Sequence, residues 1–285
     1  MCELLGMSAN VPTDICFSFT GLMLRGGKTG PHKDGWGITF YEGKGFRTFK
    51  DPEPSAQSPI ARLVQALPIK SCAVVSHIRQ ANRGCVSLEN THPFTRELWG
   101  RYWTFAHNGQ LTGYKKLPTG RHRPVGDTDS EHAFCWLLDR LEQKYPKRPA
   151  NFPAMFRYLA TLCDELRAFG VFNMLLSDGE YVMSYCSNNL HWLTRCAPFG
   201  EASLLDEEVV IDFQRETTPN DVVTLITTRP LTGNENWVKM APGEFNLFRM
   251  GERVATNQVA LEQDKKIPGY LYTLVLRSSH KRQKG

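Results

Sequence analysis

The second residue of the chain is a candidate nucleophile. If the initiator methionine is removed, Cys2 becomes N-terminal and carries a thiol and a free α-amino group on one carbon. A thiolate is a strong nucleophile, and an α-amine, whose ordinary pKa is near ~8, can act as its base at neutral pH. Taken alone, however, a free cysteine is more often a buried residue of an apolar strand. The other polar groups of the chain must decide between these two interpretations.

Three such groups follow or open predicted elements. Arg79 ends an apolar run, where a guanidinium either binds a carboxylate through two parallel hydrogen bonds or forms an ion pair at the rim. Asn108 and Gly109 can supply two N–H groups to an oxyanion, although Asn-Gly is also the strongest short signal for a hairpin turn. Asp129 lies in the first turn of a predicted helix, where a carboxylate either complements the helix dipole or receives a substrate ammonium.

Together, these groups fit one kind of substrate. A carboxylate site and an ammonium site recognise the head group of an α-amino acid. A nucleophile and an oxyanion hole at a distance from that head group imply attack on a side-chain carbonyl. Glutamine, or another γ-glutamyl amide, has both parts.

The elements that must position these groups indicate a single α+β domain of sheet and helix layers. Apolar runs and turn residues predict strands at 2–7, 38–41, 46–49, 72–78, 102–106, 171–176, 181–186, 190–193, 209–213, 222–226, 245–248 and 270–276. Helical spacing predicts helices at 15–22, 60–67, 128–141 and 149–167, the third behind a capping box formed by Thr128 and Glu131.

Composition excludes several classes of protein. The chain is 41% hydrophobic and 22% charged, as in ordinary globular proteins, and it has no apolar run near the ~20 residues that span a bilayer. Its eight cysteines form no CxxC pair, which argues against structural zinc and a disulfide framework and predicts a cytoplasmic protein. Of the net charge of +5, four come from the tail at 277–285, leaving +1, so we predict no nucleic-acid partner and no membrane partner.

Five short segments, taken in order, resemble one known family. They are Met1–Gly6 (MCELLG), His32–Gly37 (HKDGWG), Ser76–Arg79 (SHIR), His107–Gly109 (HNG) and Thr128–Glu131 (TDSE). The sequence resembles the class II glutamine amidotransferases of the N-terminal-nucleophile hydrolase superfamily over about residues 2 to 250. It is most similar to compact stand-alone bacterial members, and it is also similar to γ-glutamyl hydrolases of glutathione breakdown and ergothioneine synthesis.

This resemblance implies a four-layer αββα sandwich of antiparallel sheets and a catalytic centre. By the likeness, Cys2 attacks the amide carbon while its α-amine, acting through a water, takes and returns protons. Asn108 and Gly109 hold the oxyanion. No cofactor and no metal are implied.

The resemblance also implies a substrate-binding set. Arg79 binds the substrate carboxylate and Asp129 its ammonium, with His107 beside them. Asn82 stands where better-studied members carry Thr for the same carboxylate, and an Asn side chain still donates. His32 stands where some members have Gly, so its role is open.

Residues 2–255 are therefore expected to form the amidotransferase domain, with a strand and a basic tail at 256–285. The leading hypothesis is hydrolysis of a γ-glutamyl amide. The alternatives are an ammonia-supplying subunit for a partner synthase or ligase and a γ-glutamyl-binding module without turnover; homo-oligomers remain open. Loops at 28–33 and 113–124 are candidates for selecting the leaving group.

Overall fold

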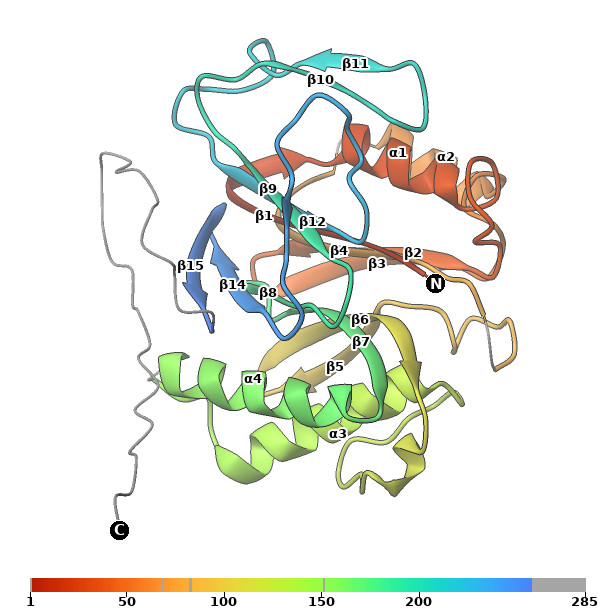
Figure 1. Ribbon diagram of the computed structural model, residues 1–285, viewed down its shortest axis with the longest axis vertical. Helices are drawn as coiled ribbons and strands as arrows, with labels where there is room; N and C mark the ends of the chain where they lie inside the picture. Colours follow the sequence, from red (N-terminus) through yellow and green to blue (C-terminus); the bar gives the residue numbers. More distant parts are fainter. Residues whose placement is uncertain (1, 68, 82–83, 151, 258–285) are drawn as a thin grey trace.

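The computed structural model describes residues 2–67, 69–81, 84–150 and 152–257 (Figure 1). The predicted site residue Asn82, the predicted strand at 270–276 and nearly all of the predicted tail segment lie outside the described residues.

Two antiparallel sheets form the centre of the molecule. The first sheet has the strand order β13 (Val238–Lys239), β9 (His191–Arg195), β12 (Val223–Thr227), β1 (Glu3–Asp14), β4 (Lys70–Ile78), β2 (Trp36–Glu42) and β3 (Gly45–Asp51). The second has the order β15 (Glu252–Thr256), β14 (Phe245–Arg249), β8 (Val182–Tyr185), β7 (Gly170–Ser177), β6 (Arg101–Leu111) and β5 (Phe94–Leu98). A small ribbon of β10 (Glu201–Ser203) and β11 (Val210–Asp212) lies at the top of Figure 1.

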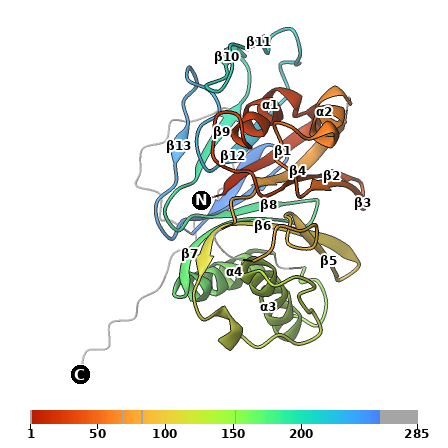
Figure 2. The same ribbon diagram turned by 90° about the vertical axis from the view of Figure 1, so that its right-hand side faces the viewer.

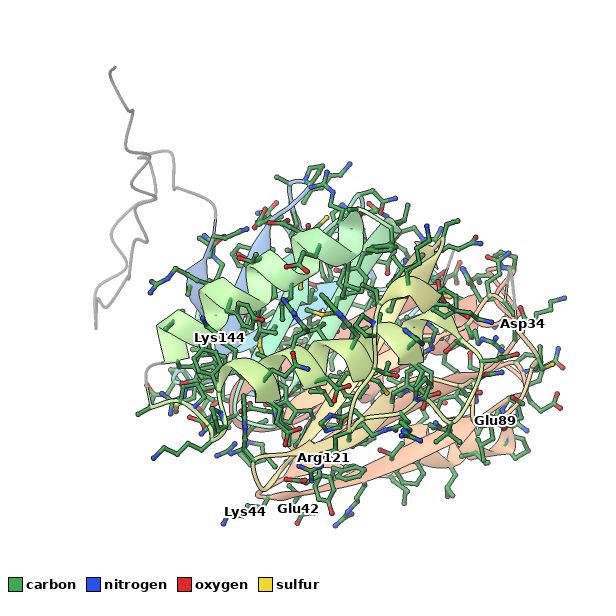
Figure 3. All side chains as sticks on the ribbon, turned by 90° about the horizontal axis from the view of Figure 1, so that it is seen from below. Asp34, Glu42, Lys44, Glu89, Arg121 and Lys144 are labelled. Atoms are coloured by element: carbon green, nitrogen blue, oxygen red, sulfur yellow. The ribbon has the colours of Figure 1, made fainter. Side chains whose placement is uncertain are left out.

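Helices cover the outer face of each sheet. The first sheet is covered by α1 (Cys16–Arg25) and α2 (Pro59–Ala66), as Figures 1 and 2 show from two sides. The second sheet is covered by α3 (Asp129–Lys144) and α4 (Phe152–Arg167), which lie across it when the molecule is seen from below (Figure 3). The predicted four-layer αββα architecture is therefore confirmed. Among the described residues, no helix combines the length and apolarity that crossing a bilayer requires.

Three apolar cores separate the four layers, and strand periodicity assigns residues to them. Successive side chains of a strand point to opposite faces, so Leu5 packs in the core beneath α1 whereas Leu4 packs between the sheets. Val74 and Val75 of β4 divide in the same way. The third core, which includes Phe134, fills the space between the second sheet and its two helices. Both faces of each sheet are buried, which explains the nearly continuous apolar runs in the central strands.

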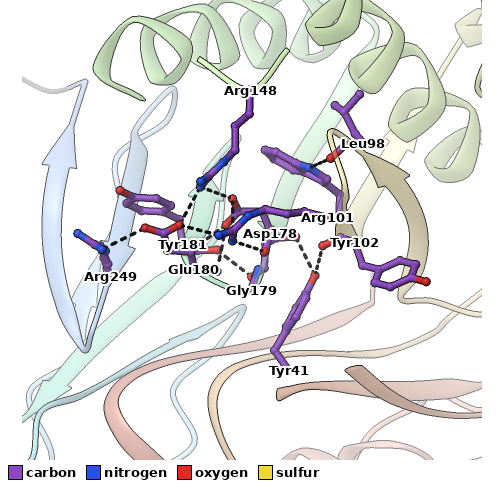
Figure 4. A network of polar contacts seen from close by, with 12 residues as sticks. Tyr41, Leu98, Arg101, Tyr102, Arg148, Asp178, Gly179, Glu180, Tyr181 and Arg249 are labelled. Atoms are coloured by element: carbon purple, nitrogen blue, oxygen red, sulfur yellow. Dashed lines mark hydrogen bonds and ion pairs between the residues drawn. The ribbon is translucent and has the colours of Figure 1, made fainter. Parts of the chain in front are cut away.

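The sheets are joined by polar contacts far from the start of β2. The buried Oη atom of Tyr41 lies 2.7 Å from Thr104 Oγ1 on β6 and 2.9 Å from the carbonyl of Ser177 on β7 (Figure 4). In the same network, Arg148 donates to Asp178 in the β7–β8 turn at 2.9 Å. Trp36 lies at the other end of β2, about 17 Å along the strand from Tyr41. It pairs with Ile78, the last residue of β4. This network therefore stabilises the sandwich without taking part in the polar cluster that follows β4.

Several local predictions need correction, and the short strands β10, β13 and β15 were not predicted. β1 continues through Asp14 instead of ending at residue 7, because Ser8 and Ala9 still pair with β12 and the last two residues pair with β4. β6 continues to Leu111, so Asn108 and Gly109 lie within a paired strand and form no turn. β5 was missed, because its central Arg and Glu interrupt the apolar alternation that predicts a strand.

The capping box is also only half formed. Thr128 accepts a hydrogen bond from the backbone N–H of Glu131 at 3.2 Å, as an N-cap should. The carboxylate of Glu131 does not return to Thr128; it accepts from the N–H groups of Val125 and Gly126 instead. Glu131 thus orders the loop that leads into α3.

Candidate active site

A pocket of about 260 Å³ opens where β1, β4, β6 and the first turn of α3 converge. It brings together five of the seven predicted site residues, which are Cys2, Arg79, His107, Gly109 and Asp129. Asn108 is fully buried beside this pocket and does not line it, and Asn82 lies outside the described residues. Residues separated by more than 120 positions in sequence therefore meet at one site.

Cys2 is a half-buried residue directly before β1, and its thiol contacts the segment that follows β4. Its Sγ accepts a hydrogen bond from the N–H of Gln80 at 3.3 Å and lies 3.6 Å from the carbonyl oxygen of the same residue. Burial raises the pKa of the Cys2 thiol, while the Gln80 N–H opposes that shift. The thiol is therefore protonated at neutral pH, and attack on a carbonyl requires a base.

Arg79 lies immediately after β4, and hydrogen bonds of both its backbone and its side chain fix its position. Its N–H donates to the carbonyl of Gly35 at 2.7 Å, and its Nη1 donates to the carbonyl of Cys85 at 2.9 Å. Asp34 accepts a hydrogen bond from the N–H of Ala81 at 2.7 Å, so the polar segment before β2 also holds the backbone two residues after Arg79. An arginine that is only 3% exposed yet lines a pocket is suited to bind an anionic group of a ligand.

Asn108 and Gly109 occupy the part of β6 that pairs with β7 and faces the nucleophile strand. The Nδ2 of Asn108 donates to Thr228 Oγ1 at 3.3 Å, and its backbone carbonyl accepts from Asn173 Nδ2 at 3.0 Å. A Cβ on Gly109 would lie 1.8 Å from the carbonyl oxygen of Val171. Only glycine lets β6 approach β7 this closely at the pocket wall.

Asp129 is the first residue of α3, where the positive end of the helix dipole favours a carboxylate. Its Oδ2 accepts from the N–H of Leu111 at 2.6 Å, and its Oδ1 accepts from the N–H of Ser130 at 2.9 Å. These contacts leave carboxylate lone pairs available to a ligand, since each oxygen can accept more than one hydrogen bond. The same bonds tie the end of β6 to the helix.

Three buried histidines lie at the pocket: His92 and His107 line it, and the ring of His77 packs against that of His92. His107 is engaged at both ring nitrogens, by Ser130 Oγ at 2.8 Å and the Val171 carbonyl at 3.1 Å, and burial lowers its pKa against the opposing effect of Asp129. Burial also holds the pKa values of His77 and His92 well below 6.5. All three are consequently neutral at pH 7 and add no charge to the site.

Several residues at or near the pocket carry no sequence signal that we recognised. Gln80 contacts the nucleophile, and His92 lines the pocket with no hydrogen-bond partner for either ring nitrogen among the described residues. Thr228 contacts Asn108 from the end of β12, 120 residues away in sequence. His32, whose role was open, is buried and does not line the pocket, and its Nδ1 lies 3.2 Å from the carbonyl of Arg25.

The predicted selecting loop at 113–124 reaches the pocket through Tyr114 and Lys115. Asp139 of α3 holds the far part of this loop, since it accepts from the backbone N–H of His122 at 3.0 Å and lies 2.8 Å from its Nδ1. His122, Asp139 and Glu142 are close enough together to surround a metal ion. The His122 ring is already engaged by Asp139 and by the carbonyl of Glu97 on β5, and the Asp139 carboxylate by His122. None of the three residues lines the pocket.

Comparison with known proteins places this chain in a family. The family model of class-II glutamine amidotransferases matches residues 1–268. The chain is 76% identical over 254 residues to a candidate glutamine amidotransferase, YafJ, of Escherichia coli K12, covering 89% of this chain and 100% of that protein. It is 46% identical over 255 residues to a candidate glutamine amidotransferase of Haemophilus influenzae, covering 90% of this chain and 86% of that one.

Solved structures agree with the fold. The crystal structure of a predicted glutamine amidotransferase from Pseudomonas aeruginosa PA01 is 53% identical, with a TM-score of 0.72, over 89% of this chain and 99% of that chain. Glutamine phosphoribosylpyrophosphate amidotransferase from B. subtilis shares the fold at 12% identity and a TM-score of 0.52, over 92% of this chain and 50% of that one. The protein belongs to the class-II glutamine amidotransferases.

Proposed function

We propose that the protein hydrolyses the γ-amide of glutamine or of another γ-glutamyl compound through a thioester on Cys2. The observation that carries this proposal is that Cys2, Arg79 and Asp129 line the same pocket. The guanidinium matches the α-carboxylate of the substrate, and the carboxylate matches its α-ammonium. In the proposed binding mode, the γ-carbonyl of the substrate lies beside the Cys2 thiol.

The first half of the reaction forms the thioester. Once Met1 has been removed, the α-amine of Cys2 takes the thiol proton and the sulfur bonds to the γ-carbon, whose carbonyl electrons move onto oxygen. The side-chain N–H of Asn108 and the backbone N–H of Gly109 stabilise that oxyanion. The amine returns the proton to the leaving nitrogen as the C–N bond breaks, which releases ammonia or an amine.

The second half consumes one water molecule. Water loses a proton to the α-amine and adds to the thioester carbon, and the C–S bond breaks as the thiol recovers a proton. The products are glutamate and the free enzyme. An ordinary thiol is mostly protonated at neutral pH, so the scheme requires a base, and the N-terminal amine fills that role.

The test is release of glutamate from glutamine, γ-glutamyl peptides and glutathione, after intact mass has established that Met1 is absent. Cys2→Ala should abolish turnover, whereas Cys72→Ala, which removes an exposed cysteine of β4, should not alter it. Full glutaminase activity in Cys2→Ala would refute the proposal. Activity that depends on an added partner protein would favour the ammonia-supplying alternative.

A further inference from the structure

The side-chain hydroxyl of Thr228 lies between the strand that carries the nucleophile and the strand that carries Asn108. Its Oγ1 accepts a hydrogen bond from the backbone N–H of Leu4 at 2.9 Å and from Nδ2 of Asn108 at 3.3 Å. Leu4 is two residues from Cys2, in strand β1, which begins directly after Cys2. One hydroxyl therefore links the two halves of the proposed catalytic centre across the sandwich.

Thr228 is itself fixed in place, so its hydroxyl has little freedom to move. Only 3% of the residue is exposed. Its N–H donates to the carbonyl of Leu4 at 3.3 Å, and its carbonyl lies 3.0 Å from Nδ1 of His191. Its position directly after β12 places it at the pocket end of the strand that pairs with β1.

The Asn108 side chain depends on this contact. Among the described residues, Thr228 holds the only side-chain hydrogen bond of Asn108, and Asn108 Oδ1 is buried without a partner. An amide terminus and a hydroxyl can bond in either amide orientation, since the hydroxyl accepts from nitrogen or donates to oxygen. In both orientations the hydroxyl restrains one end of the amide and leaves at least one side-chain N–H uncommitted.

We propose that Thr228 is a positioning residue for the reaction, which holds the Asn108 amide at a set distance and angle from the Cys2 strand. This inference rests on the proposed function and extends it to a residue that does not line the pocket. Oxyanion stabilisation requires donors that are already oriented before charge develops. A side chain that rotates between several directions loses that advantage, even though its N–H groups are still present.

The central test is Thr228→Val, which removes the hydroxyl and keeps the shape of the side chain. Because complete loss of an oxyanion donor costs about 10²–10³ in rate, loss of its restraint should lower kcat by roughly 10–100-fold. The KM for glutamine should stay within about twofold, since the substrate's head group is bound elsewhere. Thr228→Ser keeps the hydroxyl and should recover most of the activity.

Two matched variants separate positioning from a general loss of stability. Thr224→Val removes another fully buried hydroxyl of β12, one that donates to the carbonyl of Gly251 at 2.6 Å, and should lower stability without lowering kcat. In the Asn108→Ala background, adding Thr228→Val should cost little more, because two residues that act as a unit are not additive. Hydrogen exchange at the Leu4 amide should be faster in Thr228→Val than in Thr228→Ser.

The outcomes distinguish the two proposals. Wild-type protein that releases no glutamate from any γ-glutamyl compound would refute the proposed function. Active wild-type protein with an unchanged kcat in Thr228→Val would overturn the role of Thr228 alone. Losses that multiply in the double variant with Asn108→Ala, or a kcat loss that Thr224→Val shares, would overturn it as well.

Discussion

Replacing Gly109 by Ala tests whether close approach of β6 and β7 is necessary for catalysis. The new Cβ would lie 1.8 Å from the Val171 carbonyl oxygen and 2.7 Å from Nε2 of His107, where real Cβ contacts stay above 3.0 Å. The two strands must therefore separate by at least 1.2 Å (3.0 minus 1.8) at this point. Backbone atoms of a paired strand cannot yield as a flexible side chain does, so the hydrogen bonds around Gly109 must be distorted.

Two quantities should change in Gly109→Ala. Overpacking of this kind costs about 1–3 kcal/mol, which corresponds to a fall in Tm of roughly 2–10 °C for a chain of this size. Displacing the Gly109 N–H should also lower kcat for glutamate release by about 10²–10³-fold. Initial rates at saturating glutamine and thermal unfolding monitored by circular dichroism measure the two effects.

The matched control is Gly200→Ala, because a Cβ there meets no atom within 4 Å. It should leave both Tm and kcat close to their wild-type values. Wild-type Tm and kcat in Gly109→Ala would refute the steric reasoning. A lowered Tm with unchanged kcat would show instead that the N–H of Gly109 contributes nothing to the reaction.

Further predictions concern the head-group site, the loop and pH. Asp129→Asn should raise the KM for glutamine roughly 10–100-fold with a smaller change in kcat, because it removes a charged partner of the ammonium; an unchanged KM would contradict that role. Arg79→Lys should also raise KM, since an ammonium cannot bind a carboxylate in two parallel hydrogen bonds, and equal kinetics would argue against a carboxylate clamp. Asp139→Asn should weaken the hold on the loop at 113–124 and speed its proteolysis below Tm; wild-type cleavage rates would disprove that anchoring. His77 and His92 have pKa values held far below 6.5 by burial, so the unfolded chain binds more protons below pH 6.5 and stability must fall as pH drops. Urea unfolding at pH 7 and pH 5.5 should show a loss of up to about 1.4 kcal/mol per pH unit for each histidine, and His92→Gln should reduce that slope; an equal slope in this variant would exclude His92 as a contributor.

Local sequence was sufficient to identify most of the layers and the kinds of groups in the site. The helix after Thr128 and the strands before Arg79 and His107 each bury side chains that are close together in sequence. Their apolar patterns can therefore be recognised in a short stretch of the chain. The thiol, guanidinium and carboxylate could also be recognised by residue type, and the structure brings Cys2, Arg79 and Asp129 to one pocket. The combination of types, rather than any single spacing, indicated an α-amino-acid head group.

Contacts between distant segments could be decided only by the tertiary structure. Asn108 and Gly109 have the sequence of a turn, yet pairing with β7 keeps them in a strand, because tertiary hydrogen bonds outweigh local preference. Nothing in the sequence near Thr228 distinguishes it from the other threonines of its region. Its contact with Leu4 arises from the pairing of β12 with β1, and its contact with Asn108 arises from the stacking of the two sheets, so residues more than 100 positions apart meet. The types of groups needed for chemistry can thus be found in the sequence, whereas their orientation depends on the packing of the whole sandwich.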